Sequence, residues 1–408
     1  MKIAFVVSQF PAISETFILR QITGLLERGH EVDIFAYGRT DFKIDADVEK
    51  YRLLERTFYL DGYSSPPSRL LRLAKRVGLL FTSFFKNPRV VLNSLNVLKF
   101  GKSAIFLQVL SQVVPFLDKG PYDVVHCHFG PNGELGVLLK DIGLFHKKII
   151  TTFYGYDISS YLESCGDYVY QDLFNKGDLF LCVSEHIREK LIRVGCDESK
   201  IRVLRLGVDT KDFHVFPPEP KKNDECLRIL TVARLVEKKG VAYGICAVAK
   251  ALKKYPHIEY RIVGDGPLKD KLLGLIEKLK VTDNITLVGW KRKEEVENLL
   301  RESDVFLAPS VTSKRGDEEG IPVAIVEAFA QGLPVVSTHH SGIPELVQDG
   351  VSGFLARERD VDALTEKLHR LVEQPRLRFA MGREGRKFID EHYNIDALND
   401  RLASFYQD

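Results

Sequence analysis

Two glutamates flank a short stretch that is suited to binding sugars or anions. Glu319 is followed by Gly320, Ile321 and Pro322, and Glu327 stands eight residues after Glu319. Proline fits the first turn of a helix, so Glu319 is expected just before a helix and Glu327 in its second turn, both facing a ligand at the N-terminus. Free amides and the helix dipole favour an anionic or polyhydroxyl ligand there, and a carboxylate accepts hydrogen bonds from adjacent sugar hydroxyls. Two glutamates alone are most often surface residues, but the surrounding loop, glycine and proline favour a binding site.

A basic loop follows the apolar run 227–232. It contains Arg234 and Lys239 and is expected where a strand ends. Two cations in such a place can hold a diphosphate and stabilise the charge that develops as it leaves. The alternative is a basic loop exposed to water.

Glycines follow the next two apolar runs. Gly264 and Gly266 come first, but Lys269 stands where a dinucleotide-binding fingerprint needs its third glycine, so NAD binding is not expected. Gly289 and Trp290 come second and place the single tryptophan of the chain at a strand end. Backbone groups there could contact a nucleobase edge, and structural packing of the tryptophan is an equal alternative.

In the first half of the chain, His126 and His128 close an apolar run that begins at Asp123. We expect His128 to face the ligand and His126, by alternation along a strand, to face elsewhere. The pair has no third metal ligand nearby, so no metal site is expected. Asp45 and Asp47 have the spacing of a metal-binding motif, but no apolar strand adjoins them, and we interpret them as part of a solvated loop.

These residues require parallel sheets to position them. Strand-like runs separated by helical patterns predict an open parallel sheet over residues 1–212. A proline-rich, charged stretch then predicts a linker over 213–225. The pattern restarts over 226–385, and 386–408 is expected to form a helix that crosses back to the first domain. The predicted fold class is therefore α/β, with two doubly wound Rossmann-like domains facing across a cleft and the ligand at the carboxyl ends of the strands. The strand candidates are residues 3–7, 31–37, 123–127, 148–153, 179–183, 227–232, 260–263, 285–288, 305–308 and 334–337.

The composition excludes several classes of protein. With 58 basic and 56 acidic residues the net charge is +2, which gives no general attraction for nucleic acid. No apolar stretch approaches the roughly 20 residues that span a bilayer, and the first apolar run is too early and too short for a signal peptide. The six cysteines show no metal or disulfide spacing. We expect a cytoplasmic protein with reduced cysteines.

Residues 62–117 are an exception to this balance. They contain no Asp or Glu, whereas eight Lys and Arg residues alternate with Leu, Val, Phe and Ile. Such a basic amphipathic segment can lie in the headgroup region of an anionic membrane. The alternative is a pair of helices packed on their own domain with a solvated basic rim. We favour peripheral contact with the inner face of the cytoplasmic membrane.

Taken together, these motifs resemble the retaining family-4 glycosyltransferases of the GT-B fold over essentially the whole chain. The most specific part runs from Glu319 through Glu327 to Gly332. The opening stretch 10–17 is similar to the branch that builds colanic-acid-type exopolysaccharides. Further motifs stand in the family's order: Arg234 with Lys239, Gly264 to Pro267, Gly207 to Asp209, and Gly342 to Glu345.

The resemblance implies roles for several residues. Arg234 and Lys239 would hold the donor diphosphate. Glu319 and the amides of Gly320 and Ile321 would grip the transferred sugar. Glu327 would bind the ribose hydroxyls of the nucleotide, and His128 would lie beside the sugar on the acceptor side. No metal or cofactor would be needed, because side chains and a helix terminus stabilise the diphosphate.

Two positions differ from the family's pattern. Ser14 stands where many relatives carry paired glycines, so its side chain is expected to approach the phosphates. Tyr154 replaces the histidine of a motif that ends at Asp157, so acceptor contacts are expected from these two residues.

We therefore expect a retaining transferase that moves a hexose from a nucleotide sugar, UDP-sugar first and GDP-mannose next, to a lipid-linked or oligosaccharide acceptor in exopolysaccharide synthesis. A sugar phosphorylase or nucleotide-sugar epimerase on the same architecture is the alternative enzyme. A catalytically silent subunit that binds sugar nucleotides is the third hypothesis.

Overall fold

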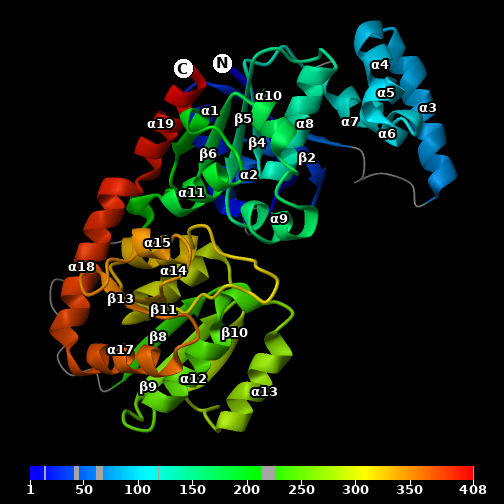
Figure 1. Cartoon of the computed structure of the whole chain (residues 1–408). Helices are drawn as coiled ribbons and strands as arrows, with labels where there is room; N and C mark the ends of the chain where they lie inside the picture. Colours follow the sequence, from blue (N-terminus) through cyan, green and yellow to red (C-terminus); the bar gives the residue numbers. More distant parts are fainter. Residues whose placement is uncertain (13–14, 41–45, 61–67, 118, 214–225, 408) are drawn as a thin grey trace.

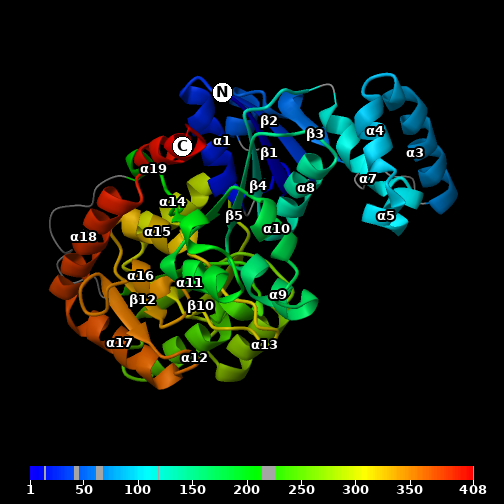
Figure 2. The same cartoon turned by 45° about the horizontal axis from the view of Figure 1, so that its top comes forward.

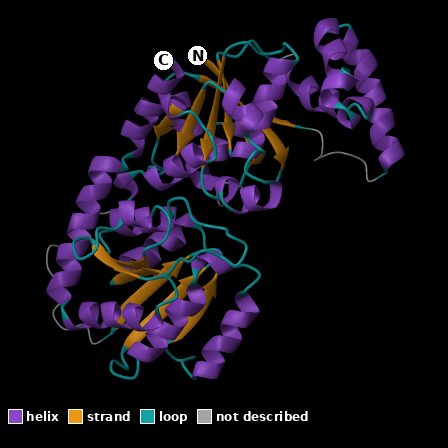
Figure 3. Ribbon diagram, in the orientation of Figure 1, coloured by secondary structure: helices purple, strands orange, loops and turns teal. Residues whose placement is uncertain are grey.

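The structure is a computed structural model that describes all residues except 13–14, 41–45, 61–67, 118, 214–225 and 408. The predicted linker lies almost entirely outside the described residues. Two parallel sheets stand one above the other in Figure 1, with helices on both faces of each sheet (Figure 3). The predicted fold class of two Rossmann-like α/β domains is confirmed.

The first sheet has seven strands in the order β3-β2-β1-β4-β5-β6-β7. All neighbouring strands are parallel. Strands β2 and β3 therefore lie on one side of β1, and β4 to β7 lie on the other. The strands are β1 (Lys2–Gln9), β2 (Glu31–Gly38), β3 (Thr57–Tyr59), β4 (Val124–His128), β5 (Lys148–Phe153), β6 (Leu179–Cys182) and β7 (Ile201–Val203).

Alternation along β1 explains how this sheet is covered. Ile3, Phe5 and Val7 pack with α1 (Thr16–Glu27) and α19 (Ile395–Gln407) on one face. Ala4 and Val6, which point the other way, pack with α7 (Gln108–Val113) and α8 (Gly130–Asp141) on the opposite face. Burial on both faces is typical of a parallel sheet.

The second sheet has six strands in the order β10-β9-β8-β11-β12-β13. Its strands are β8 (Leu227–Val232), β9 (Ile258–Val263), β10 (Ile285–Gly289), β11 (Val305–Ala308), β12 (Val335–Thr338) and β13 (Gly353–Ala356). The sequence predicted the first five of these, and β13 is an additional strand at the edge. The surrounding helices are α12 (Val241–Ala251), α13 (Lys269–Leu279), α14 (Lys293–Glu302), α15 (Val323–Ala330), α16 (Ile343–Leu346) and α17 (Val361–Glu373).

The C-terminal segment returns to the first domain. Helix α18 (Pro375–His392) packs on α15, and α19 then lies against α1. The side chain of Tyr406 in α19 is hydrogen-bonded to His126 Nδ1 at 2.7 Å. The boundary expected at residue 385 is wrong in detail, because it falls inside α18, and the chain instead bends between α18 and α19.

The other helices of the first domain form two groups. The small helices α2 (Ala46–Lys50), α9 (Ser160–Cys165), α10 (Gln171–Lys176) and α11 (Glu185–Arg193) connect its strands. Residues 69–113, here named the helical arm, project from the first domain in Figures 1 and 2, with α3 outermost and α7 packed against the first sheet. The arm comprises α7 and the helices α3 (Arg69–Phe84), α4 (Pro88–Ser94), α5 (Val97–Phe100) and α6 (Lys102–Ile105).

The two domains touch through their strand ends. The largest apolar cluster of the described residues contains Phe153 and Ile187 of the first domain together with Ile321 and Phe329 of the second. This continuous cluster fixes which loops face one another.

Candidate functional site

The candidate site lies where the strand order of each sheet reverses. In the first sheet this switch lies between β1 and β4, and in the second between β8 and β11. Glu15, Arg234 and Glu319 stand in the loops after β1, β8 and β11, respectively, and His128 is the last residue of β4. Ligands of open parallel sheets bind beside the carboxyl ends of the strands at such a switch. Each of these four groups therefore stands at the carboxyl end of a strand that borders a switch point.

Glu319 is held in a buried ion pair with Lys239. Lys239 Nζ lies 2.8 Å from Glu319 Oε2, and the two side chains are only 18% and 7% exposed. Burial alone would raise the pKa of Glu319, but the charges of Lys239 and Lys238 outweigh it and lower that pKa. The second carboxylate oxygen, Oε1, is buried and has no hydrogen-bond partner. Glu319 is therefore a fixed carboxylate with one unused acceptor.

A neighbouring histidine orients the backbone of Glu319. The Glu319 amide donates to His340 Nε2 at 3.1 Å, and the opposite ring nitrogen lies 2.6 Å from Glu358 Oε1. Because Nε2 accepts a hydrogen bond, Nδ1 carries the proton and donates it to Glu358. Sequence reasoning missed His340 and Glu358, since no spacing connects them to residue 319.

Gly320 lies against the first domain. A Cβ atom built there would stand 1.7 Å from the Tyr154 carbonyl oxygen, so no other residue fits without separating the domains. Within the described part of the chain, the amides of Gly320 and Ile321 donate no hydrogen bond. Pro322 lies at the N-cap, one position before the helix rather than in its first turn as expected, and α15 begins at Val323. The expected amide donors at the start of α15 are therefore available.

Arg234 is exposed, and its side chain forms no hydrogen bond or ion pair with the described residues. Its loop is packed against the glycines that follow β9. A Cβ at Gly264 would stand 1.9 Å from the Ala233 carbonyl oxygen, and one at Gly266 would stand 2.7 Å from that of Leu235. These glycines thus position the arginine loop. Lys239, predicted with Arg234 as a diphosphate clamp, is instead engaged by Glu319.

Glu327 occupies a different environment from Glu319. It is half-buried in α15, and burial raises its pKa to about 7, against the charges of Arg20 and Lys293. Arg20 comes from α1 of the first domain, whereas Lys293 begins α14 of the second. The two glutamates share none of these charged neighbours, and that both face one ligand stays a prediction.

The two histidines of β4 lie on the same face, and the expected separation is wrong. Their ring centroids are 4.3 Å apart. Residues two apart in a strand share a face, so alternation could not separate them. His126 is enclosed between Tyr406 and Thr152, both at 2.7 Å, and burial lowers its pKa to about 3.

His128 is also fully buried but keeps one unused nitrogen. Its Nδ1 lies 2.6 Å from the hydroxyl of Tyr154, whereas its Nε2 is buried without a partner. Burial holds the pKa of His128 well below its usual range, so the ring is neutral. Tyr154, predicted on the acceptor side, therefore contacts His128 directly.

Asp157 organises the loop after β5. Its buried carboxylate accepts hydrogen bonds from the amides of Tyr154, Gly155 and Gly130 at 2.9–3.0 Å. These contacts occupy the carboxylate within the protein. The structure thus makes Asp157 a support for the Tyr154 loop rather than a group open to an acceptor.

The remaining predicted residues are less closely involved. Gly289 accepts a hydrogen bond from the Gly264 amide through its carbonyl oxygen at 2.9 Å. The Trp290 side chain is 50% exposed, so it is not packed in the core. Ser14 lies outside the described residues.

Sequence reasoning also missed the contribution of Glu15. It is the N-cap residue of α1, yet its side chain makes no capping hydrogen bond, and its Oε2 atom is buried without a partner. Burial raises the pKa of Glu15 to about 7, and the charge of Arg234 opposes this shift. Glu15 thus interacts electrostatically with Arg234 of the other domain.

A second interdomain contact involves α11. The carboxylate of Glu345 accepts hydrogen bonds from the amides of Glu185 and His186, both at 2.9 Å. Glu318 contacts His186 and Lys190, and these contacts outweigh burial and lower its pKa to about 2. These charged contacts hold the domains together beside the candidate site.

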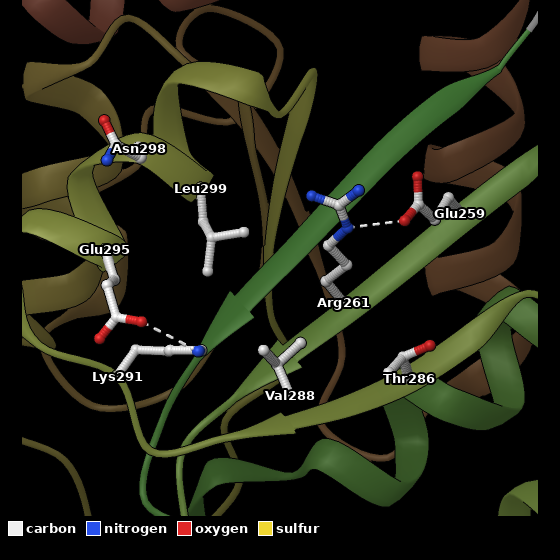
Figure 4. A pocket seen from close by; sticks show the side chains of 8 residues that line it. All are labelled: Glu259, Arg261, Thr286, Val288, Lys291, Glu295, Asn298 and Leu299. Carbon is white, nitrogen blue, oxygen red and sulfur yellow. Dashed lines mark hydrogen bonds and ion pairs between the residues drawn. The ribbon is translucent and has the colours of Figure 1, made fainter.

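A recess of about 430 Å³ on the second sheet lies away from these residues (Figure 4). Its charged side chains are paired with one another: Arg261 with Glu259 at 2.6 Å, and Lys291 with Glu295 at 3.0 Å. Because the charged groups of this recess are paired, we do not assign a ligand to it.

Two searches of the described residues gave negative results. No group of three or more His, Cys, Asp and Glu side chains is arranged to hold a metal ion. Within the same ranges, no helix combines the length and apolar character needed to cross a membrane.

Comparison with known proteins identifies the class and then the family. The chain superimposes over its full length on the Anabaena protein Alr3699/HepE, solved with UDP and glucose (TM-score 0.73, 17% identity, 99% of that chain). It superimposes equally over its full length on the sucrose-phosphate synthase tll1590 of Thermosynechococcus elongatus (TM-score 0.71, 17% identity, 98% of that chain). The architecture is that of a GT-B glycosyltransferase.

Sequence comparison agrees with this architecture. The profile "Glycosyltransferase Family 4" matches residues 14–212, and "Glycosyl transferases group 1" matches 212–388. Over the full length of both chains, the protein is 39% identical to a putative colanic acid biosynthesis glycosyltransferase, WcaL, of Salmonella typhimurium. It is 37% identical to the amylovoran biosynthesis glycosyltransferase AmsK of Erwinia amylovora, with 91% of each chain covered. The chain therefore belongs to the family-4, group-1 glycosyltransferases.

Proposed function

We propose that the protein is a retaining hexosyltransferase that uses a nucleotide sugar to extend a lipid-linked or oligosaccharide acceptor in exopolysaccharide synthesis. The observation that carries the proposal is that Arg234 follows β8, and Glu319 with the free amides of Gly320 and Ile321 follows β11, the two strands that border the switch point of the second sheet. The names of the WcaL and AmsK relatives support exopolysaccharide synthesis. The UDP and glucose named for the Anabaena neighbour support a UDP-sugar as donor, with GDP-mannose as the second choice.

The roles of the second-domain residues follow from their chemistry. Arg234 holds the diphosphate and stabilises its charge as it leaves. The amides that precede α15 and the unused Oε1 of Glu319 bind the hydroxyls of the transferred sugar. Lys239 keeps Glu319 ionised, and Glu327 binds the ribose. The positive groups present make a metal ion unnecessary for this charge stabilisation.

The transfer itself is a substitution on one face of the sugar. The bond from C1 to the diphosphate oxygen breaks, and a bond from C1 to the acceptor oxygen forms on the same face. The acceptor's proton passes to the leaving phosphate oxygen. No carboxylate nucleophile is required, and the neutral His128 presents Nε2 beside the sugar as a hydrogen-bonding group.

Product analysis tests this proposal. Purified protein is incubated with UDP-glucose or GDP-mannose, with and without membrane-extracted lipid-linked saccharide, and product anomers are determined by NMR. We expect an α-linked product that forms only with acceptor. The Arg234→Ala variant should lose about 10²- to 10³-fold in turnover, whereas the exposed control Arg383→Ala should not. Product formation without acceptor, or with phosphate alone, would support an epimerase or a phosphorylase instead.

We also propose that the helical arm contacts an anionic membrane. Helix α3 exposes apolar side chains at helical spacing, including Leu70 at 79% and Phe81 at 66%, and Phe85 after the helix is 88% exposed. Exposed apolar groups of this size indicate an interaction surface. The arm contains several Lys and Arg residues and no acid, which favours anionic headgroups.

Vesicle sedimentation tests the membrane contact. The protein should bind phosphatidylglycerol vesicles more strongly than phosphatidylcholine vesicles, and binding should weaken with added salt. The double variant Phe81→Ser/Phe85→Ser should lose most of this binding. The matched control Tyr168→Ser/Val351→Ser changes residues that are 83% and 47% exposed elsewhere and should bind as before. Equal vesicle binding by the two double variants would exclude the helical arm as the membrane contact.

A further inference from the structure

Glu15 has a position and environment that neither folding nor helix capping explains. It stands after β1, which borders the switch point of the first sheet, and it interacts electrostatically with Arg234, which follows β8 at the switch point of the second. Although it occupies the N-cap of α1, its carboxylate does not accept the hydrogen bond that a capping side chain normally accepts. The side chain is thus directed away from its own helix.

Two groups that interact electrostatically with Glu15 come from different domains. Arg234 approaches from the second domain, and Tyr154 comes from the loop after β5 in the first. Glu15 and Arg234 nevertheless form no ion pair with each other among those of the described residues. The buried Oε2 atom of Glu15 is thus left without a protein partner.

Other unpartnered atoms lie on the loops around the same switch points. His128 Nε2 and Glu319 Oε1 are buried without partners, as Glu15 Oε2 is. His128 is fully buried, and Glu319 is only 6% exposed. Buried polar groups in folded proteins are nearly always satisfied, so these three atoms indicate a polar ligand that bonds with groups from both domains.

We propose that the Glu15 carboxyl group, in its protonated form, donates a hydrogen bond to the diphosphate of the nucleotide-sugar donor, opposite the guanidinium of Arg234. This inference rests on the proposed function. An ionised Glu15 would repel the diphosphate, whereas a neutral carboxyl group has one donor to offer. Burial already raises the pKa of Glu15 to about 7 in the free protein. The positive charge of Arg234 lowers the pKa of Glu15 in the free protein, and a bound diphosphate offsets that charge. The pKa of Glu15 then rises further, so Glu15 keeps or takes up a proton when the donor binds.

The consequence is a defined pH dependence of donor binding. If only the protonated form binds, Kd for the donor should rise about tenfold per pH unit above about pH 7. Glu327 also has a pKa of about 7. If its carboxylate binds ribose, ionisation of Glu327 strengthens donor binding as pH rises. This effect ends once Glu327 is fully ionised. Comparison with a variant that changes Glu15 alone separates the two residues.

Calorimetric titration with UDP-glucose and GDP-mannose, between pH 6 and 9, tests the inference. Nucleotide sugars are used because their phosphates do not titrate in this range. The Glu15→Gln variant keeps a donor group and has no proton to lose, so its Kd should stay flat above pH 7 and be at least tenfold lower than that of the wild type at pH 9. The exposed control Glu384→Gln should follow the wild type.

A second measurement needs only the wild-type protein. Titrations at pH 8 in buffers of different ionisation enthalpy should show uptake of nearly one proton on binding. Donor binding with no proton uptake, and the same pH dependence in wild type and Glu15→Gln, would overturn the role of Glu15 while leaving the proposed function intact. Failure of both nucleotide sugars to bind at any pH would count against the proposed function itself and against this inference with it.

Discussion

Replacing Lys239 with methionine should destabilise the second domain through Glu319. The ion pair is 2.8 Å long, and both partners are largely buried. Removal of one partner from a buried pair costs about 3–5 kcal/mol, because the other charge remains without compensation. Lys238 still contributes a nearby charge but is itself bound to Asp317 at 3.0 Å. We therefore expect a loss of about 3 kcal/mol at pH 7.5.

Protonation of Glu319 limits this loss and makes it depend on pH. The wild-type pKa of Glu319 is lowered, so the pair contributes stability above the unfolded pKa and loses it as pH falls through the folded value. In the variant the carboxyl group can become neutral at a cost of about 1.4 kcal/mol per pH unit above its ordinary pKa of 4.5. The loss is then limited to about 4 kcal/mol at pH 7.5 and about 1.4 kcal/mol at pH 5.5.

Thermal unfolding measures this difference. A loss of about 3 kcal/mol should lower Tm by about 6–12 °C at pH 7.5, and by less than half as much at pH 5.5. The double variant Lys239→Met/Glu319→Gln should recover most of the stability, because no charge is left buried. Lys269→Met, which removes an exposed pair with Asp265, should change Tm by little. The reasoning is refuted if Lys239→Met is as stable as the wild type at pH 7.5. It is also refuted if the loss of stability is equal at both pH values.

Two further predictions concern the contact between the domains. Gly320→Ala should lower Tm and donor affinity together, because its Cβ would stand 1.7 Å from the Tyr154 carbonyl oxygen. The control is Gly274→Ala, where a Cβ meets nothing within 4 Å. Equal Tm and donor affinity in the two variants would contradict the tight contact. Glu345→Gln should cost about 1–2 kcal/mol, because it removes the charge of the carboxylate that accepts two amides at the start of α11. Denaturation in urea measures this loss, and an unchanged midpoint would show that the two hydrogen bonds do not need the charge.

The arrangement of strands was accessible from the sequence because it depends on local patterns. Apolar runs followed by polar loops indicated β1, β8 and β11, and these strands carry the loops of the candidate site. The loop after β11 and the proline before α15 likewise placed Glu319 beside a helix N-terminus. Short edge strands such as β13 lack a pattern long enough to recognise.

The pairing of side chains was not accessible, because it depends on how distant loops meet. Lys239 and Glu319 are 80 residues apart, and no periodicity predicts their contact. Glu15 resembles an ordinary helix cap until its unused side chain and the nearby Arg234 are seen together. His126 and His128 are different, since the period of a strand places both on one face and the sequence alone could have corrected that prediction.

The orientation of the helical arm also required the structure. Residues 62–117 predicted a basic amphipathic segment, and helix packing on the first domain was an open alternative. The small core around Val91, Leu107 and Leu110 binds the helices of the arm to one another. This arrangement leaves the apolar side chains of α3 exposed, which no local pattern specifies.

Donor binding is the central claim, and a thermal-shift panel tests it most directly. Wild type, Glu327→Ala and the exposed control Glu384→Ala are melted with UDP-, GDP- and ADP-sugars. A ligand at 100 times its Kd stabilises the folded protein by about 2.7 kcal/mol, which corresponds to a rise in Tm of about 5–11 °C. We predict such a rise for one class of nucleotide sugar in the wild type and the control, and its loss in Glu327→Ala. No rise with any nucleotide sugar would contradict the assignment of the second domain as the donor site.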